Sequence, residues 1–112
     1  LRSDFGAKIK VVEWMKIQNY LGDASTIVNT TSLGMVGKTD LPIPLNTLKK
    51  NTLVTDIVYT PIETHLLATA TKMGCRTVDG LGMLIHQAIP GFERWFGIKP
   101  GDSQALRELL IK

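Results

Sequence analysis

The spacing of apolar and polar side chains predicts strands that alternate with helices along this chain. Lys8–Val12 alternates between the two kinds of side chain, as a half-buried strand does. Short apolar or β-branched runs predict further strands at Ser25–Val28, Leu53–Val58 and Arg76–Val78. Apolar residues at helical spacing lie between these runs and after the last one. We therefore expect about four strands with flanking helices.

Turn-forming residues divide the first half of the chain into short elements. Leu1–Phe5 has the pattern of a helix end, which Gly6 would stop. Glu13–Leu21 carries apolar residues at helical spacing and is expected to be a helix. Asn29–Pro44 is a long loop rich in hydroxyl groups, glycine and proline, and such loops in compact domains are usually functional. Leu45–Lys50 is expected to form a helical turn.

Longer helices are expected in the second half. Thr60–Glu63 has the pattern of a capping box with proline at the first helical position, so a helix should start there and stop at Gly74. Another helix should begin at Leu81, and Pro90 should kink or break it, leaving a second segment through Phe96. A final amphipathic helix is predicted with one of two caps and three inward leucines: Asp102 or Ser103, then Leu106, Leu109 and Leu110.

The alternation of strands and helices predicts a fold of the α/β class, a partial Rossmann-like, doubly wound parallel sheet. Ligands of such sheets bind just outside the carboxyl ends of the strands. Asn29–Gly34 follows the second predicted strand, Tyr59 follows the third and Gly80 follows the fourth. These three segments should therefore meet at one edge of the sheet.

Composition narrows the possible functions. A length of 112 residues allows one domain, and a hydrophobic content of 44% is enough for a packed core. The formal charge of +3 comes from scattered basic residues, which disfavours a nucleic-acid surface but is compatible with an anionic cofactor or substrate. The single cysteine, Cys75, excludes an internal disulfide and is interpreted as a small buried hydrophobe. A single cysteine fits a reducing cytosol, so we expect a cytoplasmic protein, and no apolar run approaches the length of a membrane span.

The run Asp79–Gln87 is the most informative segment of the chain. Its two glycines stand at a strand-to-helix turn, where a backbone can come close to a ligand. At helical spacing, Gly80, Met83 and Gln87 share one face, and the neighbouring face is apolar. The apolar face should pack on the sheet, while the Gly80 face should border a cleft.

This run resembles the end of the NADP-dependent shikimate dehydrogenase family. The resemblance extends to Asn29–Met35 and Asp56–Pro61, and it continues through Glu63–Leu67 to Phe92, Trp95 and Gly97. It covers roughly Ala24 to Gly97, with all pieces in the family's order and spacing. It implies that residues 1–112 are the C-terminal part of an NADP-binding Rossmann-like domain with C-terminal helices, and that the N-terminal substrate domain is absent.

The resemblance implies an enzyme that reversibly reduces 3-dehydroshikimate to shikimate with NADPH in the chorismate pathway of aromatic amino-acid biosynthesis. It places Gly80 and Met83 near the nicotinamide and the Ile57 backbone on NADP, with Thr31 and Ser32 as weaker cofactor candidates. Each position also has a plainer interpretation. Gly80 would then serve backbone geometry, Met83 and Ile57 would fill the core, and the two hydroxyls would bond their own loop.

The resemblance also assigns Tyr59 and Gln87 to the substrate, whose carboxylate and hydroxyls suit a phenol and a carboxamide. The alternatives are an aromatic lid and a solvent-facing glutamine. The histidines, His65 and His86, are interpreted as surface or structural residues, and no ligand spacing predicts a metal site. Strand-end acids, Asp56 and Asp79, are interpreted as caps or turn formers.

The family's catalytic lysine and aspartate, its glycine-rich phosphate turn and its Asn-Arg segment for the 2′-phosphate have no counterpart in this sequence. No catalytic residue is therefore assigned, and we expect negligible activity from this chain alone. The lost strands should leave a sheet edge open to self-association. Two alternatives remain: a non-catalytic module that binds a nucleotide or a protein, and a related dehydrogenase acting on quinate or in the folate pathway.

Overall fold

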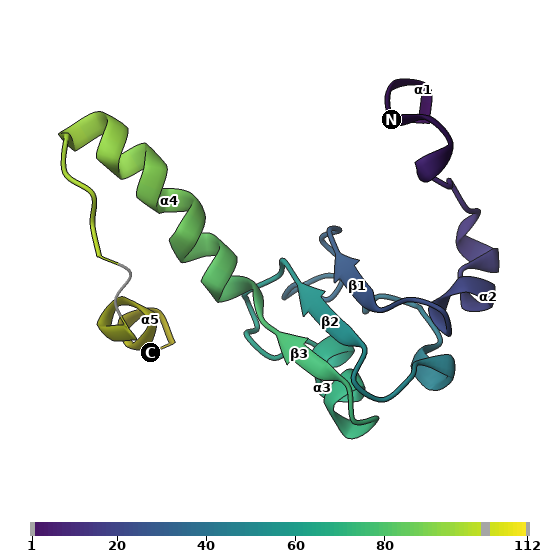
Figure 1. Ribbon diagram of the computed structural model, residues 1–112. Helices are drawn as coiled ribbons and strands as arrows, with labels where there is room; N and C mark the ends of the chain where they lie inside the picture. Colours follow the sequence, from purple (N-terminus) through teal and green to yellow (C-terminus); the bar gives the residue numbers. More distant parts are fainter. Residues whose placement is uncertain (1, 102–103, 112) are drawn as a thin grey trace.

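The computed structural model describes residues 2–101 and 104–111, and its centre is a parallel sheet (Figure 1). The strands are β1 (Thr26–Asn29), β2 (Leu53–Asp56) and β3 (Arg76–Val78), in the order β1-β2-β3. All neighbours are parallel, and the register pairs Asn29 with Asp56 at the carboxyl ends of β1 and β2. The predicted α/β class is thus confirmed, with three strands in the described part of the chain.

The predicted strand at Lys8–Val12 is wrong. The chain there continues from α1 (Arg2–Phe5) and the 3-10 turn η1 (Gly6–Lys8) into residues that pair with no described strand. Gly6 has a φ of 70°, as expected of a residue that ends a helix. A strand exists only where a neighbour accepts and donates its backbone hydrogen bonds, and the described residues bring none to this segment.

Short helical pieces occupy the rest of the first half. The helix predicted at Glu13–Leu21 is split into η2 (Trp14–Lys16) and α2 (Gln18–Leu21). Leu21 is its buried residue, so packing against the body of the protein is limited to one end. The helical turn predicted after the long loop is confirmed as η3 (Leu45–Thr47).

Helix α3 (His65–Lys72) begins later than the predicted start at Thr60. Its N-cap is Thr64, whose hydroxyl accepts a hydrogen bond from the Leu67 amide at 3.4 Å. The same hydroxyl donates to the buried Asp56 carboxylate at 2.8 Å, and this second bond fixes Thr64 as the cap. The predicted stop is confirmed, because Gly74 follows the helix with a φ of 80°.

Helix α4 (Gly80–Phe96) runs through Pro90 as one helix, so the predicted break is wrong. Pro90 is exposed, and its missing N–H removes one backbone hydrogen bond without ending the helix. Helix α4 ends at Gly97, which has a φ of 69°. Figure 1 shows α4 projecting from the sheet, with α5 (Gln104–Ile111) beside it.

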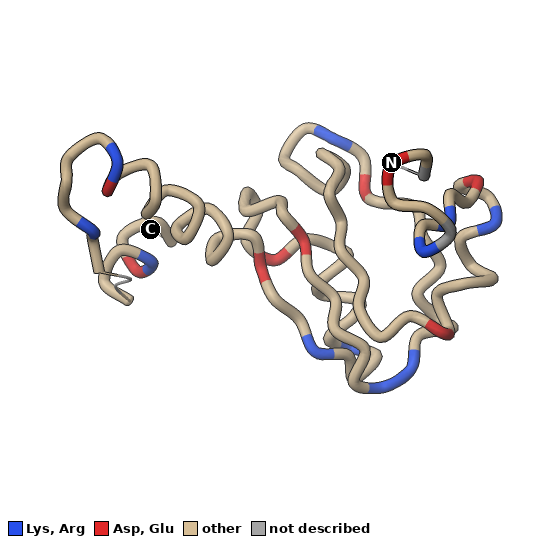
Figure 2. The backbone as a smooth tube through the Cα atoms, turned by 45° about the horizontal axis from the view of Figure 1, so that its top comes forward, with Lys and Arg blue, Asp and Glu red and all other residues tan. Residues whose placement is uncertain are grey.

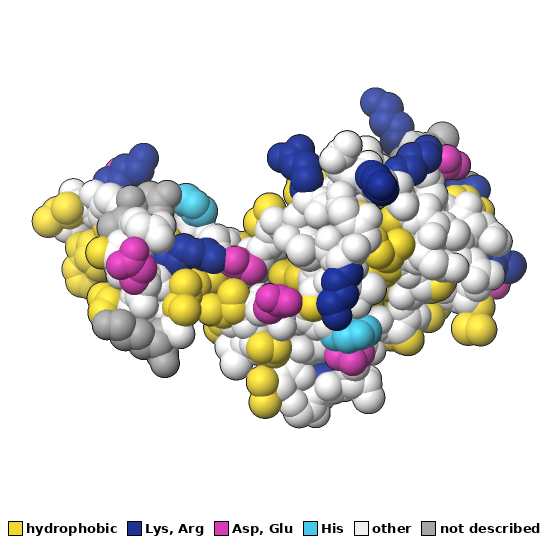
Figure 3. Space-filling view, turned by 90° about the horizontal axis from the view of Figure 1, so that it is seen from below, with side chains coloured by type: hydrophobic (Ala, Val, Ile, Leu, Met, Phe, Trp, Pro, Cys, Tyr) yellow, Lys and Arg dark blue, Asp and Glu magenta, His cyan; other side chains and the backbone are white. Residues whose placement is uncertain are grey.

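The inward packing predicted for three leucines of α5 is also wrong. They are all exposed, at 42%, 65% and 48% for Leu106, Leu109 and Leu110, since α5 contacts α4 rather than the sheet. Figure 3 shows hydrophobic side chains gathered on the lobe that α4 and α5 form. The predicted caps Asp102 and Ser103 lie outside the described residues.

The core lies between β2, α3 and η3. It contains the side chains of Leu45, Val54, Leu66, Leu67, Ala70 and Cys75. Cys75 is buried, as predicted for a small hydrophobe. Among the described helices, none combines the length and the apolar character that crossing a membrane requires.

Candidate functional site

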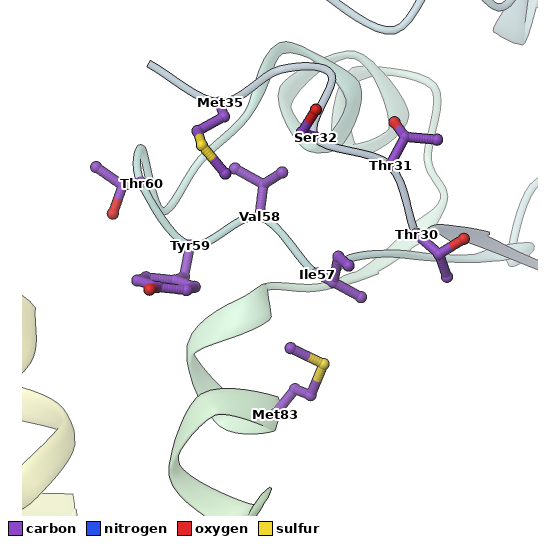
Figure 4. Close-up of a pocket in the computed structure, with 9 residues that line it drawn as sticks. All are labelled: Thr30, Thr31, Ser32, Met35, Ile57, Val58, Tyr59, Thr60 and Met83. Atoms are coloured by element: carbon purple, nitrogen blue, oxygen red, sulfur yellow. The ribbon is translucent and has the colours of Figure 1, made fainter. Parts of the chain in front are cut away.

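A cavity of about 350 Å³ opens at the carboxyl ends of β1 and β2 (Figure 4). We call it the strand-end cavity. It is lined by Thr30, Thr31, Ser32, Met35, Ile57, Val58, Tyr59, Thr60 and Met83. Two loops and one helix contribute these residues, as the parallel topology predicts for a ligand site.

Five of the predicted site residues line the strand-end cavity. They are Thr31, Ser32, Ile57, Tyr59 and Met83. Gly80 does not line it but is buried beside it, and Gln87 lies outside its lining on the exposed surface of α4. Because Gln87 follows Met83 by four residues, the two project from the same face of the helix.

Gly80 lets the start of α4 pack against the backbone at the end of β2. A Cβ at this position would lie 2.5 Å from the Ile57 carbonyl oxygen and 2.6 Å from that of Val58. No side chain fits such a gap, so glycine is required for the packing itself. Gly80 therefore serves backbone geometry, which was its plainer interpretation. The packing also brings Met83, one turn later, to the strand-end cavity.

Asp56 joins three segments around this cavity. Its Oδ1 accepts hydrogen bonds from Asn29 Nδ2 at 2.9 Å and from the Val58 amide at 3.0 Å. Its Oδ2 accepts from the Thr64 hydroxyl at 2.8 Å. The side chain is only 1% exposed, and three donors compensate for its burial. The interpretation of Asp56 as a turn former is confirmed.

Asn29 carries this network into the loop after β1. Its Oδ1 accepts from the Thr31 amide at 3.0 Å and from the Thr31 hydroxyl at 2.8 Å, while its Nδ2 also donates to the Leu33 carbonyl at 3.1 Å. The Thr31 hydroxyl in turn accepts from the Leu33 amide at 3.1 Å. Thr31 thus bonds its own loop, which was the plainer alternative for this residue.

The strand-end cavity has an apolar side, on which Met35 and Val58 join the predicted residues Ile57 and Met83. Figure 4 shows Met83 reaching up from α4 toward Ile57, with Met35 next to Val58. Met35 reaches this place because its loop folds back, and the Val36 amide donates to the Thr60 carbonyl at 3.1 Å. The sequence gives no signal for that fold-back, so Met35, Val58 and Thr60 were missed.

The N-terminus of α4 is held by an ion pair with α5. Asp79 is the N-cap and accepts from the Leu81 amide at 3.0 Å, as its interpretation as a cap predicted. Arg107 donates from both terminal nitrogens to the two carboxylate oxygens of Asp79, one of these bonds at 3.2 Å. Hydrogen bonding from Arg107, with help from the Leu81 amide, lowers the pKa of Asp79, while partial burial opposes the shift.

The two histidines lie away from the strand-end cavity. His65 is exposed, with its Nδ1 3.8 Å from Asp40 Oδ2, and His86 is exposed on α4. Neither lines the cavity. In the part of the chain that the structure describes, no group of three His, Cys, Asp or Glu residues could hold a metal ion. Figure 2 shows the basic residues spread along the chain rather than clustered.

Comparison with known proteins agrees with this geometry. The family of shikimate 5′-dehydrogenase C-terminal domains matches residues 80–110. The shikimate dehydrogenase (NADP⁺) of Cereibacter sphaeroides is 64% identical over 111 residues, which are 99% of this chain and 40% of that enzyme. The chain is homologous to the C-terminal part of shikimate dehydrogenases. It spans about 40% of the length of the curated relatives.

Solved structures show the same fold. Quinate dehydrogenase from Corynebacterium glutamicum, in complex with NAD, matches with a TM-score of 0.83 and 34% identity over 97% of this chain and 39% of its own. Shikimate dehydrogenase from Thermus thermophilus, in complex with NADP(H) and shikimate, matches with a TM-score of 0.74 and 27% identity over 89% of this chain and 36% of its own. The Rossmann-like arrangement predicted from the sequence is therefore shared with dehydrogenases of this family.

Replacing Gly80 by alanine tests the close packing of α4. Because the added methyl group would meet the Ile57 and Val58 carbonyls, we expect Gly80→Ala to lower the free energy of unfolding by about 1–3 kcal/mol. Urea titration followed by circular dichroism measures this change. Gly82→Ala is the control: its methyl group meets nothing within 4 Å, so it should stabilise the helix by about 0.5–1 kcal/mol. Equal effects of the two changes would contradict the packing argument.

Acid titration tests the ion pair between α4 and α5. Because the pKa of Asp79 is lowered on folding, the pair stabilises the fold fully at pH values above the unfolded pKa of 3.8. This stabilisation is lost as the pH falls through the folded pKa. Melting temperatures should therefore fall more on acidification for the unmodified chain than for Arg107→Gln. Arg76→Gln, at an exposed arginine of β3, should keep the steeper fall. Identical pH profiles for the unmodified chain and Arg107→Gln would refute this assignment.

Proposed function

We propose that this chain forms the C-terminal portion of an NADP-dependent shikimate dehydrogenase, which reversibly reduces 3-dehydroshikimate with NADPH. The observation that carries the proposal is the strand-end cavity, where five residues predicted from the family's motifs come together. Identity of 57–64% to NADP-dependent shikimate dehydrogenases supports both the substrate and the cofactor.

The residues of the strand-end cavity fit the nicotinamide end of NADP. Its lining surface is mostly apolar, with Met83 and Ile57 on one side and the hydroxyls of Thr31 and Ser32 on another. Apolar walls suit a flat ring and exclude water from it. When bound, the cofactor supplies the hydride. Gly80 serves this site through its packing, because it sets the distance between α4 and the end of β2.

Tyr59 and Gln87 are proposed to bind the substrate. Tyr59 lines the cavity and is 43% exposed, so its hydroxyl is accessible to a ligand. Gln87 is exposed on the face of α4 that carries Met83, and its carboxamide offers donors and an acceptor to vicinal hydroxyls. The described residues supply this binding wall but no assigned proton donor for the developing alkoxide, which the reaction also requires.

Two other functions deserve comparison. The match to an NAD-bound quinate dehydrogenase favours a quinate-using relative, since Tyr59 and Gln87 suit either polyhydroxy acid. The higher identity to NADP-dependent shikimate dehydrogenases makes shikimate the first choice. A non-catalytic module would bind neither NADPH nor shikimate, so calorimetry with these two compounds separates it from a dehydrogenase portion.

Complementation tests the proposed activity. The chain is mixed with the part of the Cereibacter sphaeroides enzyme that precedes the matched region, and NADPH consumption with 3-dehydroshikimate is followed by absorbance. We expect turnover from the mixture and none from the chain alone. Tyr59→Phe should lower kcat/KM roughly 10–100-fold, because a hydrogen bond to a charged substrate group is lost.

The control for this variant is the other tyrosine. Tyr20 lies outside the strand-end cavity, with Lys10 Nζ 4.4 Å from its ring centroid. Tyr20→Phe should therefore leave kcat/KM unchanged. Turnover by the chain alone, or equal losses from the two tyrosine variants, would overturn the proposal.

We also propose that this chain self-associates through the free edge of β1. In the described sheet, β1 pairs only with β2. Ser25 and Asn29 carbonyls accept bonds from β2, so by alternation the backbone groups of Val28 point to the open edge. Val28 is also 51% exposed. Such an edge invites a strand from another copy.

Light scattering over a concentration series measures this association. We expect the mass of the unmodified chain to rise with concentration. Val28→Pro removes a donor on the open edge without removing a bond to β2, so this variant should stay monomeric. Val11→Pro, at an exposed residue outside the sheet, should associate like the unmodified chain. A clean monomer at every concentration would count against edge pairing.

A further inference from the structure

Asp56 connects both loops that wall the strand-end cavity, although it does not line the cavity itself. We propose that Asp56 is a positioning residue, which holds the loop after β1 and the turn after β2 in one fixed arrangement for the cofactor. This inference rests on the proposed function, because it names what keeps the cofactor wall in place. It adds a role for Asp56 beyond forming a local turn.

The loop after β1, which we call the first wall, is held through Asn29. Asp56 Oδ1 accepts from Asn29 Nδ2 at 2.9 Å, and this bond fixes the orientation of the Asn29 amide. The oxygen of that amide then accepts twice from Thr31, at 3.0 Å from its N–H and 2.8 Å from its hydroxyl. Thr31 lines the strand-end cavity. A chain of two bonds therefore joins Asp56 to this wall.

The turn after β2, which we call the second wall, is held directly by Asp56. The same Oδ1 atom accepts from the Val58 amide at 3.0 Å. Val58 lies between Ile57 and Tyr59, and all three line the cavity. Since one oxygen atom serves both walls, a displacement of the carboxylate would move them together.

The remaining oxygen has a different task. Asp56 Oδ2 accepts from Thr64, the N-cap of α3, which is 0% exposed and belongs to the scaffold rather than to the cavity. Oδ1 of the carboxylate thus binds the two walls (the wall side), and Oδ2 binds the cap of α3 (the scaffold side). This division makes the positioning role separable from a contribution to stability, because each side can be removed independently.

Nuclear magnetic resonance of the ¹⁵N-labelled 112-residue chain, titrated with NADPH, tests the inference. Asp56→Ala removes both sides of the carboxylate, and Thr64→Ala removes only the bond on the scaffold side. We expect Asp56→Ala to shift the Thr31 and Tyr59 amide signals and to weaken NADPH binding roughly tenfold. Thr64→Ala should lower the melting temperature while NADPH affinity stays within about twofold.

Asp56→Asn provides the conservative rescue. Its amide oxygen can still accept from Asn29 and Val58, so NADPH binding should return close to that of the unmodified chain. If Asp56→Ala does not fold, Asn29→Ser replaces it, because this change cuts the bond between Asp56 and the first wall. Equal losses of affinity in Thr64→Ala and in the wall variant would refute the positioning role.

The outcomes for this role and for the proposed function differ. If the unmodified chain shows no NADPH-dependent shifts, cofactor binding by this chain fails. The Thr31 and Tyr59 amide signals, recorded without NADPH, then still test the positioning role. Shifts at both Thr31 and Tyr59 in Asp56→Ala, with those signals unmoved in Thr64→Ala, support it. Shifts confined to the start of α3 overturn it.

Discussion

The strand-end cavity depends on one set of interactions, the hydrogen bonds of the buried Asp56 carboxylate. A carboxylate that is 1% exposed must find hydrogen-bond donors within the protein, because leaving it unpaired would cost far more than ordering the chain around it. Its three donors come from the end of β1, the turn after β2 and the cap of α3. Satisfying one side chain therefore ties two of the segments that line the strand-end cavity to the cap of α3.

Gly80 imposes the complementary constraint, from the side of α4. It lets the helix start against the Ile57 and Val58 carbonyls. Met83, one turn later, then forms one side of the strand-end cavity. The site thus combines a polar scaffold, held by hydrogen bonds, with an apolar lining that includes Met83. The solved Thermus thermophilus enzyme holds NADP(H) and shikimate, and the function proposed for this chain draws on this division of chemistry.

The rest of the described structure has an open strand edge and exposed apolar side chains. The chain spans about 40% of its curated relatives, one edge of β1 is open, and α4 and α5 carry exposed apolar side chains. Helix α5 has no buried residue among those described and is tied to the start of α4 by the Asp79–Arg107 ion pair. The walls of the strand-end cavity are held by the hydrogen bonds of Asp56 and Asn29, while α5 is held to α4 at the Asp79–Arg107 ion pair.

The sequence by itself determined the α/β class, three of the strands and five of the cavity residues. The class and the strands depend on local periodicity, and the five residues belong to motifs that can be recognised from their spacing along the chain. The tertiary structure decided what depends on distant partners. Lys8–Val12 is no strand because no described neighbour pairs with it, and α3 is capped at Thr64 because the Asp56 carboxylate binds that hydroxyl. Likewise, Met35 and Arg107 reach their partners only through loop folding and helix docking, which no local pattern encodes.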